Sequence, residues 1–302
     1  MTTPTLVVAL GGNALLKRGQ PLEADLQQQN VAQAAAVVAA LTADWRVVLV
    51  HGNGPQVGLL ALQNSAYRAV APYPLDVLGA ESQGMIGYLL QQALKNCLPA
   101  QEVSVLLTQV EVAADDPAFH APTKYIGPLY GAPEADALRH VKGWVMHADG
   151  DHFRRVVPSP RPQRIVELAA IQALLAQQHL VICCGGGGAP VVREGQGLRG
   201  VEAVIDKDLC AALLAEEIGA DALLILTDAE AVCLDWGTPA QRALADVTPA
   251  DLAGLTFDAG SMGPKVEAAC RFATRSHGVA GIGPLQHGST ILTGQHGTRI
   301  HG

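Results

Sequence analysis

TLVVALGGNA, residues Thr5–Ala14, is the stretch that decides the fold. Its first six residues are apolar without polar alternation, which predicts a β-strand buried on both faces. Gly11 and Gly12 then let the backbone turn sharply and come close to a neighbouring group, and Asn13 adds a hydrogen-bonding amide. A strand that ends in such a turn is typical of open α/β sheets, which bind ligands at the carboxyl ends of their strands.

The same pattern returns twice in the chain. Residues 46–50 predict a second buried strand, which ends in HGNGPQ, a segment that includes Gly52, Asn53 and Gly54. Residues 180–184 form a third, which ends in four consecutive glycines, Gly185–Gly188. Three such turns indicate phosphate or anion binding through backbone N–H groups, although a tight turn with nothing bound explains any one of them about as well.

Three common motifs are absent. The sequence has no Gly-Lys dipeptide, which excludes the Walker A loop. The dinucleotide fingerprint fails at the four-glycine turn, because Pro190 stands where its last glycine belongs. There is also no Gly-x-Ser-x-Gly, so a hydrolase with a nucleophile elbow is unsupported.

Composition narrows the class of protein. The chain has 302 residues, of which 49% are hydrophobic, so it has enough apolar residues for a substantial core. Its formal net charge of -8 argues against nucleic acid or an anionic membrane as partner. The six cysteines lack C-x-x-C spacing and the ten histidines lack His-Glu-x-x-His, so no dedicated metal site is expected. No signal peptide or membrane-spanning run is visible, and we expect a cytoplasmic protein.

Alternating strands and helices follow the first turn. Helices are expected at residues 22–43, 75–97 and 163–178, and another with Pro55 in its first turn that runs through Val57, Leu60 and Ala61. Strands are expected at residues 46–50, 103–108, 180–184, 221–227, 279–283 and 289–293. This alternation predicts a single domain with a mainly parallel open sheet between helical layers, a three-layer α/β/α sandwich. Residues 111–162 are polar and rich in proline and glycine, which predicts a small protruding lid, in which the pair Arg154 and Arg155 fits a solvated hairpin edge.

Two lysines stand at the starts of predicted helices. Asp206 is a plausible N-cap that places Lys207 in a first helical turn. Pro264 suits the first position of another helix, and Lys265 follows it. A lysine there opposes the helix macrodipole, whereas an anion bound between the two helix ends would favour both lysines. Asp208 could accept hydrogen bonds from both ammonium groups. The alternative interpretation is two exposed lysines in water and a carboxylate that only favours its helix.

Together these motifs resemble those of the carbamate kinases, within the amino-acid kinase superfamily. The matching segments run along the whole chain: residues 9–14, 51–58, 82–88, 123–128, 156–160, 185–190, 201–208 and 260–265. The resemblance implies the fold predicted above, a homodimer, and the reversible reaction ATP + carbamate = ADP + carbamoyl phosphate, run toward ATP synthesis during nitrogen-compound catabolism.

The resemblance also implies roles for residues. Lys124, Lys207, Lys265 and Asp208 correspond to the catalytic set; Gly11, Gly12, Asn13, Gly52, Asn53 and Gly54 to the carbamoyl-phosphate site; and Gly185, Gly186, Gly187, Gly188, Thr227, Asp228 and Lys265 to the nucleotide site. The first site would lie in an N-terminal lobe of about residues 1–180, the second in a C-terminal lobe of about 181–302. Mg²⁺ would be carried by the nucleotide phosphates and water, with no protein metal ligand.

Three positions depart from the family pattern. Tyr125 replaces a common proline, Ser82 a frequent threonine and Asp228 a frequent glycine. None of these changes removes a charged group from the proposed centre. Carbamate is already an anion and needs no general base, so positioning and charge neutralisation would carry catalysis, with the lid excluding water. The alternatives are another phosphotransferase of the superfamily, or a catalytically silent nucleotide-binding regulator; a dehydrogenase is weaker still.

Overall fold

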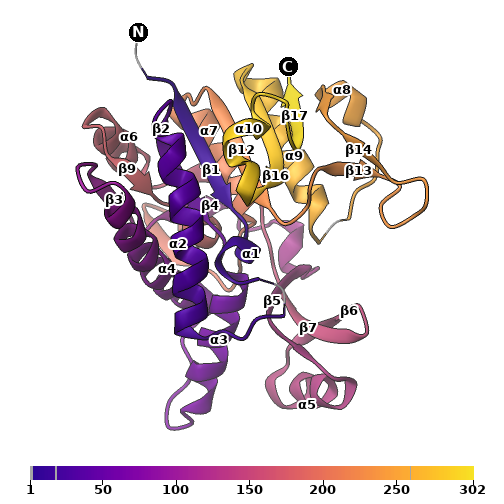
Figure 1. The fold of residues 1–302 in the computed structure, drawn as a ribbon. Helices are drawn as coiled ribbons and strands as arrows, with labels where there is room; N and C mark the ends of the chain where they lie inside the picture. The colour runs from indigo at the N-terminus through magenta and orange to yellow at the C-terminus, as the bar shows by residue number, and fades with distance from the viewer. Residues whose placement is uncertain (1–2, 18, 259) are drawn as a thin grey trace.

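A computed structural model describes residues 3–17, 19–258 and 260–302, with the backbone but not the side chain of Asn13. Its centre is an eight-stranded sheet with the strand order β15-β17-β16-β12-β1-β2-β9-β3 (Figure 1). The strands are β1 (Thr5–Leu10), β2 (Arg46–His51), β3 (Val103–Val105), β9 (Leu180–Ile182), β12 (Ala222–Thr227), β15 (Asp246–Val247), β16 (Val279–Pro284) and β17 (Thr298–His301). Neighbouring strands are parallel except β16 and β17, so the predicted mainly parallel sheet is confirmed.

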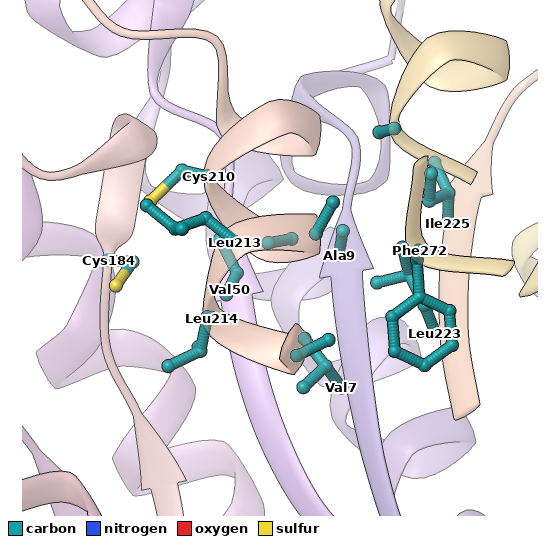
Figure 2. Packing of buried hydrophobic residues seen from close by; sticks show 14 of the residues in the cluster. Val7, Ala9, Val50, Cys184, Cys210, Leu213, Leu214, Leu223, Ile225 and Phe272 are labelled. Carbon is teal, nitrogen blue, oxygen red and sulfur yellow. The ribbon is translucent and has the colours of Figure 1, made fainter. Parts of the chain in front are cut away.

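Strand β1 contributes to two separate cores because its side chains alternate between the faces of the sheet. Leu6, Val8 and Leu10 pack with α2 (Ala24–Leu41), α4 (Leu75–Cys97) and α10 (Gly288–Ile291). Val7 and Ala9 pack with α6 (Leu168–Ala176), α7 (Lys207–Ile218) and α9 (Met262–Ser276) on the other face, as Figure 2 shows for part of this cluster. The three-layer α/β/α sandwich predicted from the sequence is therefore present.

A small subdomain protrudes from the body, as Figure 1 shows. It consists of a three-stranded sheet, β5 (Lys124–Tyr130), β7 (His152–Val157) and β6 (Val145–Asp149), with α5 (Ala132–Lys142) and its own small apolar cluster. Where β5 meets α3 (Gly54–Ala66), a Cβ on Gly58 would lie 2.0 Å from Cα of Gly127. A side chain on Gly58 would separate the two backbones, and Gly127 has a φ of +74°, a conformation that favours glycine.

The remaining elements connect these parts. They are α1 (Gly12–Leu15), α8 (Pro249–Leu252), the 3₁₀ turns η1 (Pro117–Phe119), η2 (Gly185–Gly187) and η3 (Leu285–His287), a four-stranded sheet of β4 (Gln109–Val112), β8 (Pro162–Ile165), β10 (Ala189–Glu194) and β11 (Gly197–Gly200), and the hairpin of β13 (Val232–Leu234) and β14 (Arg242–Leu244). Among the helices of the described ranges, none is long and apolar enough to cross a membrane.

Two expected elements differ from the structure. The strand expected at residues 289–293 is wrong, because α10 occupies most of this segment and the last strand, β17, begins at Thr298. The helix expected at 163–178 begins only at Leu168, because Pro162–Ile165 pairs with β4 as strand β8. In both places the segment is short and its sequence fits either conformation, and long-range strand pairing decides between them.

Candidate active site

The glycine turns meet at one edge of the central sheet, because parallel neighbouring strands end on the same side. The N–H of Gly11 donates to the carbonyl of Leu226 at 2.8 Å, and that of Gly52 donates to the carbonyl of Leu10 at 3.0 Å. These bonds hold the turns after β1 and β2 against each other and against the end of β12. The predicted substrate-binding turns are therefore neighbours in space.

Gly52 lies where two groups of the site come closest. A Cβ built on Gly52 would lie 3.1 Å from the amide nitrogen of Gly12 and 3.4 Å from Cδ of Lys207. The side chain of Lys207 therefore passes directly over the turn after β2. A larger residue at position 52 would push the lysine away from the glycine turns.

Helix α7 begins at this edge with a charged first turn. Asp206 is its N-cap, and its carboxylate accepts from the N–H groups of Asp208 at 2.8 Å and Leu209 at 3.2 Å. The predicted cap is therefore confirmed, and it fixes the start of the helix at Lys207. The carboxylate of Asp208 accepts a hydrogen bond from the ammonium group of Lys207.

Helix α9 brings the second lysine to the same carboxylate. The Nζ atom of Lys265 donates to Oδ2 of Asp208 at 2.9 Å, while Lys207 donates to Oδ1. Both contacts predicted for Asp208 are thus present. The alternative of two solvated lysines is wrong, because the side chains of Lys207 and Lys265 are only 10% and 14% exposed. Lys207 is the first residue of α7, and Lys265 is the fourth residue of α9, which begins at Met262 and not at Pro264 as expected. The macrodipole adds positive potential at the start of each helix.

Lys207, Asp208 and Lys265 form a buried triad, and burial and charge act in opposite directions on the pKa values of its members. Burial opposes ionisation of Asp208, but the charges of Lys207 and Lys265 outweigh it and hold the pKa of the carboxyl far below its usual value. Burial lowers the pKa of Lys207, whereas for Lys265 the carboxylate of Asp208 outweighs burial and raises the pKa. The triad is thus held together by buried, charge-assisted hydrogen bonds.

Lys124 enters the site from the lid and pairs with Asp206. Its Nζ atom lies 2.5 Å from Oδ2 of Asp206, whose pKa is lowered because the positive charge of Lys124 outweighs the effect of burial. Sequence reasoning gave Asp206 only a capping role. The ion pair joins residues 82 positions apart, so no local pattern could reveal it.

The charges of the cluster do not cancel. Three lysines (Lys124, Lys207 and Lys265) face two carboxylates (Asp206 and Asp208), which leaves one net positive charge if all five groups are ionised. In a chain of formal net charge -8, this excess is local and lies beside the N–H groups of the glycine turns. The arrangement suits an anion with several oxygens, such as a phosphoryl group.

Asn53 and the four-glycine turn form the floor beside the cluster. The Nδ2 atom of Asn53 donates to Oγ of Ser82 at 2.8 Å, so the serine holds the amide in place. A Cβ on Gly185 would lie 2.4 Å from Nε2 of His51, and one on Gly186 would lie 2.1 Å from Nδ2 of Asn53. The structure thus places Gly186, predicted for the nucleotide, against Asn53, which was predicted for the other substrate.

His51 is a buried neutral side chain in this floor. Its Nδ1 atom lies 3.0 Å from the carbonyl of Gly52, and because a carbonyl only accepts, Nδ1 carries the proton. Burial lowers the pKa of His51 to about 4, and the charge of Lys207 acts in the same direction. His51 therefore adds no charge to the cluster near neutral pH.

The other predicted nucleotide residues follow β12. Thr227 ends this strand, and its hydroxyl donates to Oδ1 of Asp228 at 3.2 Å. The negative charge of Asp228 contributes to the raised pKa of Lys265, so both residues lie on the side of the site that α9 forms. The side chain of Asn13 lies outside the described part of the chain, and its predicted role stays a prediction.

Tyr125 lies at the junction between the lid and the start of α9. Its hydroxyl donates to the carbonyl of Ala148 at 2.7 Å, and the guanidinium of Arg154 lies 5.8 Å from the centre of its ring. A Cβ on Gly260 would lie 3.6 Å from the ring. The residue that departs from the family pattern thus ties two lid strands together beside Lys124.

Comparison with known proteins agrees with this geometry. The profile of the amino acid kinase family matches residues 4–280. Carbamate kinase from Rhizobium meliloti (strain 1021) is 54% identical over 299 residues, which cover 98% of this chain and 92% of the relative. Carbamate kinase from Escherichia coli (strain K12) is 54% identical over 296 residues, 98% of this chain and 99% of the relative.

Solved structures agree as well. Carbamate kinase from Giardia lamblia bound to citric acid has a TM-score of 0.93 and 41% identity, and covers 99% of this chain and 98% of its own. The same enzyme bound to AMP-PNP has a TM-score of 0.89 over the same shares of the two chains. The chain belongs to the amino acid kinase family and, within it, to the carbamate kinases.

Proposed function

We propose that this chain transfers a phosphoryl group between ATP and carbamate, giving ADP and carbamoyl phosphate, and that it runs toward ATP in nitrogen-compound catabolism. The observation that carries the proposal is Asp208, which holds Lys207 and Lys265 at the edge where the glycine turns meet. The full-length identity to curated carbamate kinases supports the same reaction. No observation favours a different acceptor or a silent regulator.

The charge arrangement suits the chemistry of this transfer. Carbamate is an anion at neutral pH, so its oxygen can attack the γ-phosphorus without a general base. The transferring phosphoryl group develops charge on its equatorial oxygens, which Lys207 and Lys265 are placed to neutralise. The two lysines keep fixed positions because Asp208 binds both, so little reorganisation is needed during the reaction.

We assign the two substrates to different parts of the edge. Carbamoyl phosphate binds at Gly11, Gly12, Asn13, Gly52, Asn53 and Gly54, and the nucleotide binds beside Thr227, Asp228 and Lys265. The buried turn Gly185–Gly188, first predicted for the nucleotide, is better suited to support Asn53 from below, because it packs against that residue and His51. Lys124 closes the site from the lid through Asp206 and helps to exclude water.

Mg²⁺ is expected to enter with the phosphates of the nucleotide. When bound it would neutralise part of the phosphate charge. Both carboxylates of the cluster already accept hydrogen bonds from lysines, so they are poorly suited as metal ligands. We also propose a homodimer, as the family resemblance implies, and a cytoplasmic location, as the cysteine spacing of the sequence suggests.

An acceptor panel tests the proposal. Purified protein is assayed for ADP formation from ATP with carbamate, acetylglutamate, aspartate or UMP as acceptor. We expect turnover with carbamate alone. Turnover with another acceptor in its place would contradict the proposed function, and binding of ATP without any turnover would favour the silent regulator.

A further inference from the structure

Gln56 is a buried amide that lacks a hydrogen-bond partner. It lies in the first turn of α3 and is 1% exposed. Neither its Oε1 nor its Nε2 atom has a partner among the residues that the structure describes. A buried amide of this kind costs folding free energy, because its hydrogen bonds to water are lost and not replaced.

Another buried glutamine shows how the fold normally treats this side chain. The Nε2 atom of Gln83 donates to the carbonyl of Thr108 at 3.0 Å, and its Oε1 accepts from the N–H of Thr108 at 2.9 Å. Both ends of that amide are satisfied, and it fixes the chain between α4 and β4. The amide of Gln56 makes no such bond at either end among the described residues, so a bound group is a natural partner for it.

The position of Gln56 indicates which bound group this is. It directly follows Asn53, Gly54 and Pro55, the turn that forms one wall of the proposed carbamoyl-phosphate site. A Cβ on Gly12 would lie 3.7 Å from Cδ of Pro55, so the first turn of α3 packs against the other glycine turn. Gln56 therefore belongs to the segment that would surround this substrate.

The chemistry of the substrate matches an amide. Lysine ammonium groups and glycine N–H groups can only donate, which suits phosphoryl and carboxylate oxygens. The amino group of carbamate is itself a donor and needs an acceptor, and the carboxylates of Asp206 and Asp208 already accept from lysines. A glutamine amide offers one acceptor and one donor, complementary to the N–H and C=O of a carbamoyl group.

We propose that Gln56 is a specificity-determining residue that recognises the carbamoyl group, with Oε1 accepting from its amino group and Nε2 donating to its oxygen. The inference rests on the proposed function. It explains how the site distinguishes carbamoyl phosphate from acetyl phosphate, which has the same shape but a methyl group in place of the amino group. A site built to bind an N–H group rejects an analogue that lacks it, because its polar atoms stay unpaired.

The test compares two glutamines with unpaired amides. Gln56→Met removes the amide at nearly constant volume, and Gln27→Met does the same in α2, where Nε2 of Gln27 is also buried without a partner among the described residues. Each variant and the wild type are assayed for ATP formation from ADP with carbamoyl phosphate and with acetyl phosphate. Thermal unfolding is followed in the absence of substrate. Gln56→Glu is a second variant, which keeps an acceptor but loses the donor and adds negative charge.

We expect both methionine variants to be at least as stable as the wild type, because each removes an unsatisfied amide. Only Gln56→Met should lose discrimination, with the kcat/KM ratio of carbamoyl phosphate to acetyl phosphate falling about tenfold, the worth of one good hydrogen bond. Gln56→Glu should raise the KM for carbamoyl phosphate above that of Gln56→Met, because its negative charge repels the substrate.

Two results would contradict the account in different ways. An unchanged substrate ratio in both Gln56 variants overturns the inference and leaves the proposed function intact. A wild type that forms no ATP from carbamoyl phosphate overturns the proposed function, and the inference falls with it.

Discussion

Nζ of Lys265 lies 2.9 Å from Oδ2 of Asp208, a contact that joins two helices across 57 residues of the chain. The other oxygen of the same carboxylate accepts from Lys207. One buried anion thus positions two ammonium groups, and neither lysine could be held as firmly in water. Because the side chain of Asp208 is 3% exposed, water does not compete with the lysines for this carboxylate.

Replacing Asp208 by Asn should uncouple the two lysines. An amide of the same shape can accept with only one of its two ends, so one ammonium group loses its partner and its position. We expect kcat for ATP formation to fall about 100-fold or more, the usual cost of losing a preorganised electrostatic group. Steady-state kinetics with carbamoyl phosphate and ADP measures it.

The same two helices offer a matched control for this prediction. Glu216 on α7 accepts from Arg271 on α9 at 2.7 and 2.9 Å, and from Arg275 at 3.3 Å. Glu216→Gln should therefore lower the thermal stability but leave kcat unchanged. A similar loss of kcat in both variants would mean that Asp208 acts only by holding α7 to α9.

Gly58→Ala should displace the lid. A Cβ there would lie 2.0 Å from Cα of Gly127, so the strand that carries Lys124 must move. Such overpacking costs about 1–3 kcal/mol, and it should raise the KM for carbamoyl phosphate as Lys124 leaves the site. Gly79→Ala on α4 is the control, because a Cβ built there meets nothing within 4 Å, and its KM should stay unchanged.

His51 should make folding stability depend on pH. Its pKa is about 4 in the folded state because burial disfavours the charge, against 6.5 when the chain is unfolded. As the pH falls, His51 is therefore protonated in the unfolded state before it is protonated in the folded state. The contribution of neutral His51 to the folding stability is complete above pH 6.5 and is lost as the pH falls toward 4. The loss of folding free energy between pH 6.5 and pH 4 amounts to about 3 kcal/mol.

Urea unfolding of wild type and His51→Asn from pH 4 to pH 7 measures this contribution. The asparagine amide can still donate to the carbonyl of Gly52 but does not titrate in this range. The stability difference between the two proteins should change over the interval from pH 6.5 to 4. A constant difference would show that His51 titrates alike in both states.

Tyr125→Ala should loosen the lid sheet. The substitution removes the hydrogen bond to the carbonyl of Ala148 and the ring beside Arg154. Hydrogen exchange of residues 145–157 should become faster, because local opening costs less free energy. Tyr67→Ala, at a position 67% exposed, is the control and should leave these rates unchanged.

Much of the fold and the site could be predicted because the signals are local. Unbroken apolar runs marked the central strands, and β1 ends where its run meets Gly11. Asp206 as an N-cap placed Lys207 and Asp208 on one helical turn, and Pro264 placed Lys265 near the start of another. The contact of both lysines with Asp208 could then be predicted on the one assumption that the starts of the two helices lie close together.

Other features depend on contacts that no local pattern contains. Lys124 reaches Asp206 only because the lid folds back over the site. The packing of Gly185–Gly188 on His51 and Asn53 follows from the order of strands in the sheet, in which β9 lies next to β2. Gln56 ends the HGNGPQ segment, but the sequence does not show that its amide is buried and lacks a partner among the described residues.

ATP formation from ADP and carbamoyl phosphate, measured for the wild type beside Lys265→Ala, tests the central claim most directly. The account predicts that the wild type forms ATP and that the variant, folded and of similar thermal stability, is about 100-fold slower or worse. A variant as fast as the wild type, or a wild type that forms no ATP, would contradict it.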